Sequence, residues 1–162
     1  MAALTAAALI IFVIEAQIPL PVALPGIKLG LANTITLFAL FFSRGRNGDV
    51  RLTTVDAFMI LICRIILGAL LTGRIVALIY SIAGGLLSFA VQAVMTRFVS
   101  DKQIWVCGAV GAVFHNIGQI FAAVAVTGTP AIFAYLPVLI VTGIITGIIT
   151  GFVAQFTVAR IP

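Results

Sequence analysis

The sequence predicts an all-α integral membrane protein with six transmembrane helices, forming a single domain over residues 1–162. Of its 162 residues, 63% are hydrophobic and only 8% are charged. A soluble domain needs more polar residues than this to cover its surface. Between Lys102 and Arg160 no formally charged residue occurs. That stretch alone is long enough for two membrane spans of about 20 residues each.

Six apolar segments can be counted along the chain. They are residues 2–19, 29–42, 55–71, 75–96, 104–126 and 131–157. The second segment is short for a span of about 20 residues, so part of the preceding sequence PLPVALPGIKLG must lie at membrane depth. Its prolines disfavour a continuous helix. We therefore expect a structured loop between the first two helices, packed against protein or lining a cavity.

The distribution of basic residues predicts the orientation in the membrane. Three arginines lie in the second connection, two basic residues in the fourth, and Arg160 near the end, whereas the opposite side has only Lys28 and Arg74. The positive-inside rule places the basic connections, and with them both ends of the chain, in the cytoplasm. The basic residues are too scattered for a nucleic-acid interface. We expect a multi-pass protein of the cell membrane.

Small residues mark surfaces at which helices pack closely. Gly143, Gly147 and Gly151 fall on one face of the last segment, with threonines beside them. The first segment opens with alanines, including Ala3 and Ala7 in an AxxxA spacing. Such small-xxx-small surfaces allow close backbone approach. Two interpretations stay open: packing within this chain, or docking on another membrane subunit.

Polar residues inside the predicted spans indicate a binding site. Ionisable groups in a span are costly and face a partner or a cavity. The depth of each polar residue in its span and the predicted orientation of the spans together place these groups between the midplane and the external surface. The cytoplasmic halves look comparatively apolar. The predicted substrate-binding residues are Glu15, Lys28, Asn33, Arg64, Tyr80, His115, Asn116 and Gln119. The alternative for any one of them is an ordinary ion pair or a hydrogen bond between neighbouring helices.

The charges of this set favour an anionic ligand, and the sequence gives little support for catalysis. Lys28 and Arg64 outnumber Glu15, so a phosphate or carboxylate group fits best. There is no GxxxxGK[ST] loop for ATP hydrolysis. The aspartates are isolated, so a magnesium-dependent prenyl-diphosphate synthase lacks its usual ligands. We expect no enzyme activity, no cofactor and no metal site.

Four sequence segments resemble one family. They are PGIKLGLAN at residues 25–33, RIILGALLTG at 64–73, YSIAGGLLS at 80–88 and GAVFHNIGQ at 111–119. These segments look like the Gx transporter family, whose members are often labelled heptaprenyl diphosphate synthase component I. The resemblance covers nearly the whole chain. The family is in turn similar to the S components of energy-coupling factor (ECF) transporters, which are six-helix proteins.

The resemblance implies a substrate-binding membrane subunit of an importer. S components capture a vitamin- or cofactor-like molecule from outside, and dock on a shared ECF transmembrane scaffold subunit driven by two cytoplasmic ATPases. By this resemblance Ala3 and Ala7 would belong to the docking face. Two alternatives remain: a non-transporting membrane subunit of a redox or isoprenoid/quinone-related complex, and an intramembrane isoprenoid-processing enzyme.

Overall fold

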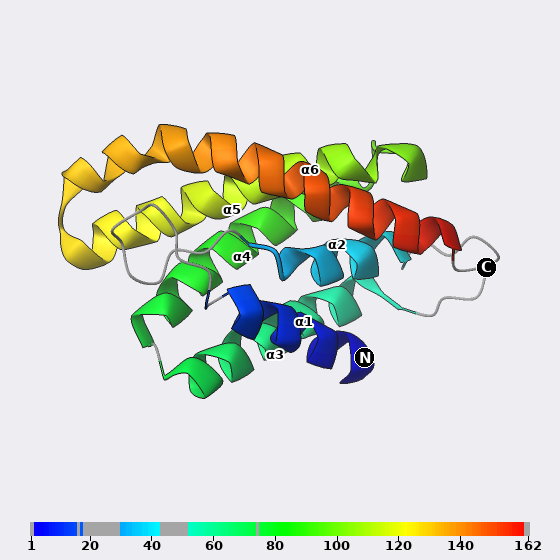
Figure 1. Ribbon diagram of the computed structural model, residues 1–162, viewed down its shortest axis with the longest axis horizontal. Helices are drawn as coiled ribbons and strands as arrows, with labels where there is room; N and C mark the ends of the chain where they lie inside the picture. The colour runs from blue at the N-terminus through cyan, green and yellow to red at the C-terminus, as the bar shows by residue number, and fades with distance from the viewer. Residues whose placement is uncertain (1, 16, 18–29, 43–51, 74, 161–162) are drawn as a thin grey trace.

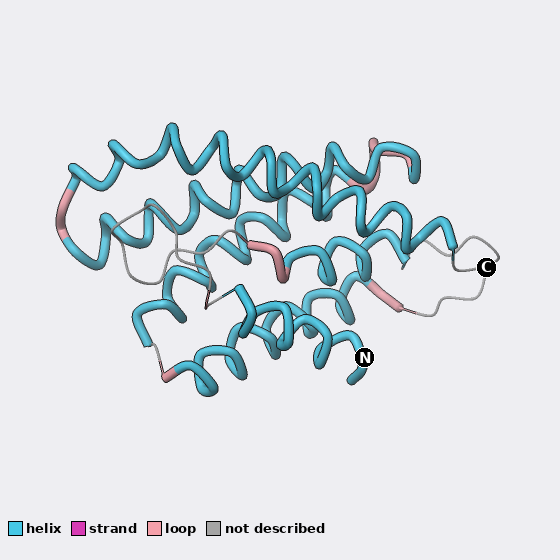
Figure 2. Tube along the Cα trace, in the orientation of Figure 1, coloured by secondary structure: helices cyan, strands magenta, loops and turns pink. Residues whose placement is uncertain are grey.

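The protein is a bundle of helices, shown here in a computed structural model (Figures 1 and 2). The structure describes residues 2–15, 17, 30–42, 52–73 and 75–160, and within these ranges every regular element is helical. The elements are α1 (Ala2–Glu15), α2 (Asn33–Phe42), α3 (Thr54–Thr72), α4 (Ile75–Met95), η1 (Asp101–Gln103), α5 (Ile104–Thr127), η2 (Pro130–Tyr135) and α6 (Leu136–Arg160). The predicted all-α fold is confirmed for this part of the chain.

Four of the helices are long and apolar enough to cross a membrane. They are α3, α4, α5 together with η1, and α6 together with η2, of 19, 21, 27 and 31 residues. The helices α1 and α2 have 14 and 10 residues. At about 1.5 Å per residue they extend roughly 21 and 15 Å, less than the hydrocarbon core of about 30 Å. The six predicted segments therefore appear as six helices, of which four have the length of a span.

Local sequence explains where α3 begins and ends. The hydroxyl of Thr53 accepts a hydrogen bond from the Asp56 amide, and the Asp56 carboxylate accepts one from the Thr53 amide. This reciprocal capping box satisfies donors that the first turn of a helix leaves unpaired. At the other end Gly73 has φ +64°, a left-handed conformation that glycine adopts without steric cost. Together these signals hold α3 to the length of one span.

Neighbouring helices run in opposite directions, and α2 lies among the others. In Figure 1, α1, α3 and α5 begin at the end of the bundle where α2, α4 and α6 finish. The short α2 contacts α1, α3, α4, α5 and α6. Eight of its ten residues are buried. A helix enclosed in this way can present polar side chains to several neighbours at once.

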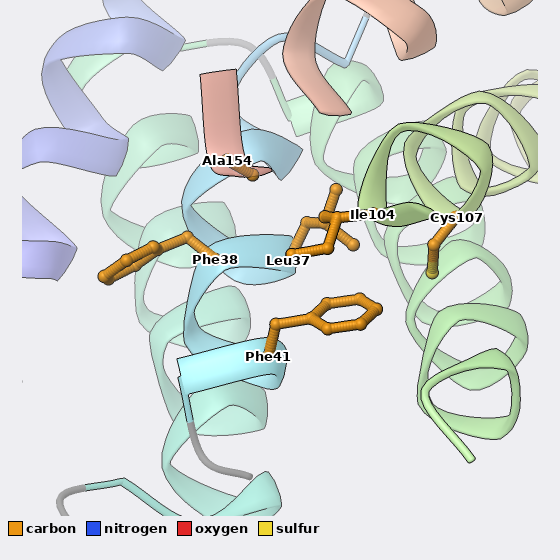
Figure 3. Packing of buried hydrophobic residues seen from close by; sticks show 6 residues of the cluster. All are labelled: Leu37, Phe38, Phe41, Ile104, Cys107 and Ala154. Carbon is orange, nitrogen blue, oxygen red and sulfur yellow. The ribbon is translucent and has the colours of Figure 1, made fainter. Parts of the chain in front are cut away.

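An apolar cluster fixes one end of α2 (Figure 3). Leu37, Phe38 and Phe41 of α2 pack with Ile104 and Cys107 of α5 and with Ala154 of α6. A second cluster joins Ala39 and Leu40 of α2 to the first half of α3. These contacts hold the apolar end of α2, so its polar start at Asn33 lies toward the second half of α3, near Arg64.

The helices α5 and α6 pack backbone to backbone through glycine. A Cβ atom on Gly108 would lie 2.5 Å from the carbonyl oxygen of Gly147, and one on Gly147 would lie 2.6 Å from the Cα of Ala109. Only a residue without a side chain permits this approach. Of the two interpretations of the glycine stripe, packing within the chain is the one observed for Gly143, Gly147 and Gly151, which contact α5.

Candidate functional site

The carboxylate of Glu15 joins the end of α1 to the start of α2. Its two oxygens accept hydrogen bonds from the backbone amides of Gly30 and Ala32, the second at 3.3 Å. Gly30 has φ +81°, which lets the chain turn into α2 at this point. A carboxylate here also complements the positive end of the α2 dipole. Glu15 is 4% exposed, so this contact lies inside the protein.

Arg64 extends from the middle of α3 to the first residue of α2. Its Nη2 donates a hydrogen bond of 2.8 Å to the Oδ1 of Asn33. Arg64 is 3% exposed and Asn33 7% exposed. The guanidinium also interacts electrostatically with Glu15. Glu15, Asn33 and Arg64, which come from three helices, therefore form one buried polar group that we call the Arg64 cluster.

Two hydrogen-bond donors of the Arg64 cluster are unused. Within the described part of the chain, neither the Nε of Arg64 nor the Nδ2 of Asn33 has an acceptor. Because Arg64 occupies the Oδ1 of Asn33, the amide has its nitrogen directed elsewhere. Buried donors are normally paired, and an unpaired donor costs about 1–3 kcal/mol. These two groups are suited to an acceptor group on a ligand.

His115 and Gln119 of α5 lie beside the Arg64 cluster. The Nε2 of His115 and the Nε2 of Gln119 are 3.1 Å apart. A Cβ on Gly30 would lie 3.1 Å from the ring of His115 and 3.0 Å from the Nδ2 of Asn33. Both α5 side chains also pack against Gly84 of α4. Five predicted site residues are therefore brought together: Glu15, Asn33, Arg64, His115 and Gln119.

Tyr80 and Asn116 face other surroundings. Tyr80 is buried in an apolar cluster with Ile120, Ala123, Ile132 and Leu139. The Nδ2 of Asn116 donates a hydrogen bond of 2.6 Å to the carbonyl oxygen of Leu139 on α6. Asn116 thus joins α5 to α6, as the alternative interpretation of a polar residue in a span expects. On the same helix, His115 and Gln119 therefore face the Arg64 cluster and α4, whereas Asn116 faces α6.

Lys28 lies outside the described residues. The described part of the cluster has one positive and one negative group, Arg64 and Glu15. A preference of the site for an anion therefore depends on Lys28, and that preference remains a prediction.

Comparison with protein families identifies the chain's relatives. Residues 4–157 match the family described as heptaprenyl diphosphate synthase component I. The chain belongs to this family. The match covers almost the full length and agrees with the resemblance of the four sequence segments. No curated protein and no solved structure matches the chain. With its four long apolar helices, this member of the heptaprenyl diphosphate synthase component I family is an all-helical membrane protein.

Sequence reasoning missed buried polar residues in the other half of the bundle. Thr36 of α2 and both Ser88 and Gln92 of α4 are at most 2% exposed. These three residues lie in the half of the bundle that the sequence predicts to be comparatively apolar. The spacing of Ser81, Ser88 and Gln92 was the available signal, because residues seven and four apart share one face of a helix. That face of α4 carries small and polar residues, while its large aliphatic residues point outward.

The two alanines of the predicted docking face differ in exposure. Ala3 is exposed and Ala7 is half-buried, so Ala3 is open to contact with another protein. Among the described residues, no group of three or more His, Cys, Asp and Glu side chains could hold a metal ion.

Proposed function

We propose that this member of the heptaprenyl diphosphate synthase component I family is the substrate-binding S component of an ECF-type importer in the cell membrane. It would capture a small anionic vitamin- or cofactor-like molecule from outside. The observation that carries the proposal is the Arg64 cluster. A buried arginine with an unused Nε, beside an asparagine with an unused Nδ2, is costly in a membrane protein unless a ligand uses it.

The proposal includes six membrane crossings with both ends of the chain in the cytoplasm. The alternating directions of α1 to α6 support it, as does the basic character of the connections that would face the cytoplasm. In this orientation the Arg64 cluster lies in the outer half of the membrane. Lys28 would add the positive charge that makes the site selective for an anion.

The energy for import would come from partner subunits. The partners in the proposal are the ECF transmembrane scaffold subunit and two cytoplasmic ATPases, and the chain itself would not be an enzyme. The AxxxA surface at Ala3 and Ala7 would dock on the scaffold, since exposed small residues on a membrane helix permit close approach of a second helix.

Native mass spectrometry of the tagged protein, gently extracted from its own host, tests the proposal. We expect the scaffold subunit, the ATPases and a bound small anion to copurify. Arg64→Ala and Lys28→Ala should each remove the bound anion. Retention of the anion by both variants would show that the binding-site assignment is wrong.

A second candidate follows from the family description. The description names a component of a prenyl diphosphate synthase. It suggests that the chain is a non-transporting membrane subunit of an isoprenoid/quinone-related or redox complex. In the same experiment, copurification of stoichiometric soluble synthase or redox subunits without ATPases would favour this candidate. Product formation from prenyl substrates and Mg²⁺ by the chain alone would instead identify an enzyme.

A further inference from the structure

Two buried hydroxyl groups lie farther along the bundle than the Arg64 cluster, toward the end at which α2 and α4 finish. Thr36 and Ser88 are each 1% exposed. Within the described part of the chain, neither the Oγ1 of Thr36 nor the Oγ of Ser88 has a hydrogen-bond partner. A buried hydroxyl without a partner destabilises the folded protein. Their presence on two different helices calls for an explanation beyond the packing of either helix.

Contacts along α2 and α4 place the two hydroxyls at the same depth. On α4, Gly84 packs against His115, and Gln92 packs against Gly111. Ser88 lies between them, about 6 Å along the helix from Gly84. On α2, Asn33 bonds Arg64 and Leu37 packs with Cys107, so Thr36 lies about 4.5 Å past Asn33 in the same direction. The helices α2 and α4 are in contact.

Small residues line α4 and α5 at this depth, and side chains of neighbouring helices pack against them. The inward face of α4 offers Gly84, Gly85 and Ser88, and α5 contributes Gly111. The side chain of Gln92, one turn along α4 from Ser88, packs against Gly111, since its Nε2 would lie 2.0 Å from a Cβ on Gly111. Polar groups that lack partners in such a place are normally satisfied by a buried water or by a ligand.

We infer a second polar subsite between α2 and α4, in which the Oγ1 of Thr36 and the Oγ of Ser88 bind one small uncharged group that both donates and accepts hydrogen bonds. Water and an alcohol hydroxyl have this chemistry. Water can occupy this subsite whether or not the protein is part of an importer. Its use by a ligand rests on the proposed function. That ligand would carry an acceptor for Arg64 and Asn33 and a hydroxyl roughly one helical turn, about 5 Å, away.

A high-resolution structure of the wild-type protein in nanodiscs tests the subsite directly. We expect density within hydrogen-bond distance of both hydroxyl oxygens. An isolated peak in protein that native mass spectrometry shows to be ligand-free identifies water. Density continuous with a larger molecule at Arg64 identifies the ligand hydroxyl. Hydroxyls that instead bond the carbonyl oxygens of Ala32 and Gly84 in their own helices, with no density between them, would overturn the inference.

Paired variants give an independent readout that needs no ligand. Thr36→Val and Ser88→Ala should couple, because removing either hydroxyl already releases the shared group. We expect the double variant to melt within about 1 °C of the less stable single variant, since groups that share one partner are not additive. Leu37→Ala in place of Thr36→Val is the matched control and should add its full effect to that of Ser88→Ala. Fully additive shifts for Thr36→Val and Ser88→Ala would show that no group bridges them.

Discussion

The α5–α6 interface and the Arg64 cluster both join helices within the bundle, with opposite chemistry. Glycines such as Gly108 and Gly147 bring two backbones into direct contact and leave no space between them. The Arg64 cluster brings charged and amide groups together from three helices and leaves two donors unused. Close glycine packing contributes to stability, whereas unused buried donors reduce it. The two regions should therefore respond differently to substitution.

The largest effect is expected at the α5–α6 interface. Gly147→Leu would place a side chain where the Cα of Ala109 lies 2.6 Å from a Cβ. Overpacking usually costs about 1–3 kcal/mol, and a clash with backbone belongs at or above the upper end. We expect loss of a cooperative thermal transition in detergent. The control is Ile149→Phe on the exposed side of α6, which should melt within about 2 °C of wild type. A folded Gly147→Leu protein would contradict the close packing of these helices.

Arg64→Ala should affect both stability and binding, and a second substitution should separate them. Arg64→Ala removes a buried positive charge that bonds Asn33 and interacts electrostatically with Glu15, so we expect it to lower the melting temperature. Arg64→Ala combined with Glu15→Gln should recover part of the melting temperature, yet bound anion measured by native mass spectrometry should remain absent. Recovery of the anion together with stability would mean that Arg64 has only a structural role.

Asn33→Asp should change binding without loss of stability. The carboxylate keeps the acceptor for the Nη2 of Arg64 but replaces the unused Nδ2 donor with oxygen. We expect a melting temperature equal to or above that of wild type, and about tenfold weaker retention of the bound anion, which corresponds to about 1.4 kcal/mol. Asn116→Asp is the comparison. The Nδ2 of Asn116 donates to the carbonyl of Leu139, so removal of this donor should mainly lower the melting temperature. Unchanged retention by Asn33→Asp would remove Asn33 from the binding site.

The smallest effect is expected for Tyr80→Phe. Tyr80 lies in an apolar cluster with Ile120 and Leu139, so removal of its hydroxyl should leave retention of the anion within twofold. Its melting temperature should also stay close to that of wild type. A tenfold loss of retention would place the Tyr80 hydroxyl in the binding site, as the sequence alone predicted.

The positions of the helices could be predicted from the sequence better than the packing partners of each side chain. Hydrophobic length alone located α3 to α6, because the membrane requires about 20 apolar residues for each span. It also indicated that Glu15 and Arg64 need partners, since buried charges are costly. It could not separate Asn116 from His115, because adjacent residues on a helix point about 100° apart and only the packing of α4 and α6 decides which neighbour each meets. Thr36 and Ser88 were missed because hydroxyl residues are common in membrane helices and carry no charge to mark them.

The brevity of α2 has a consequence for the biogenesis of the protein. The described helix α2 has ten residues, about half of what a membrane span requires. Its enclosed position depends on α3 to α6, which are synthesised after it. Seating of α2 is therefore a late step in which the later helices assemble around it. Substitutions in α5 or α6 that delay assembly should expose the early part of the chain to quality-control proteases before the mature protein shows any defect.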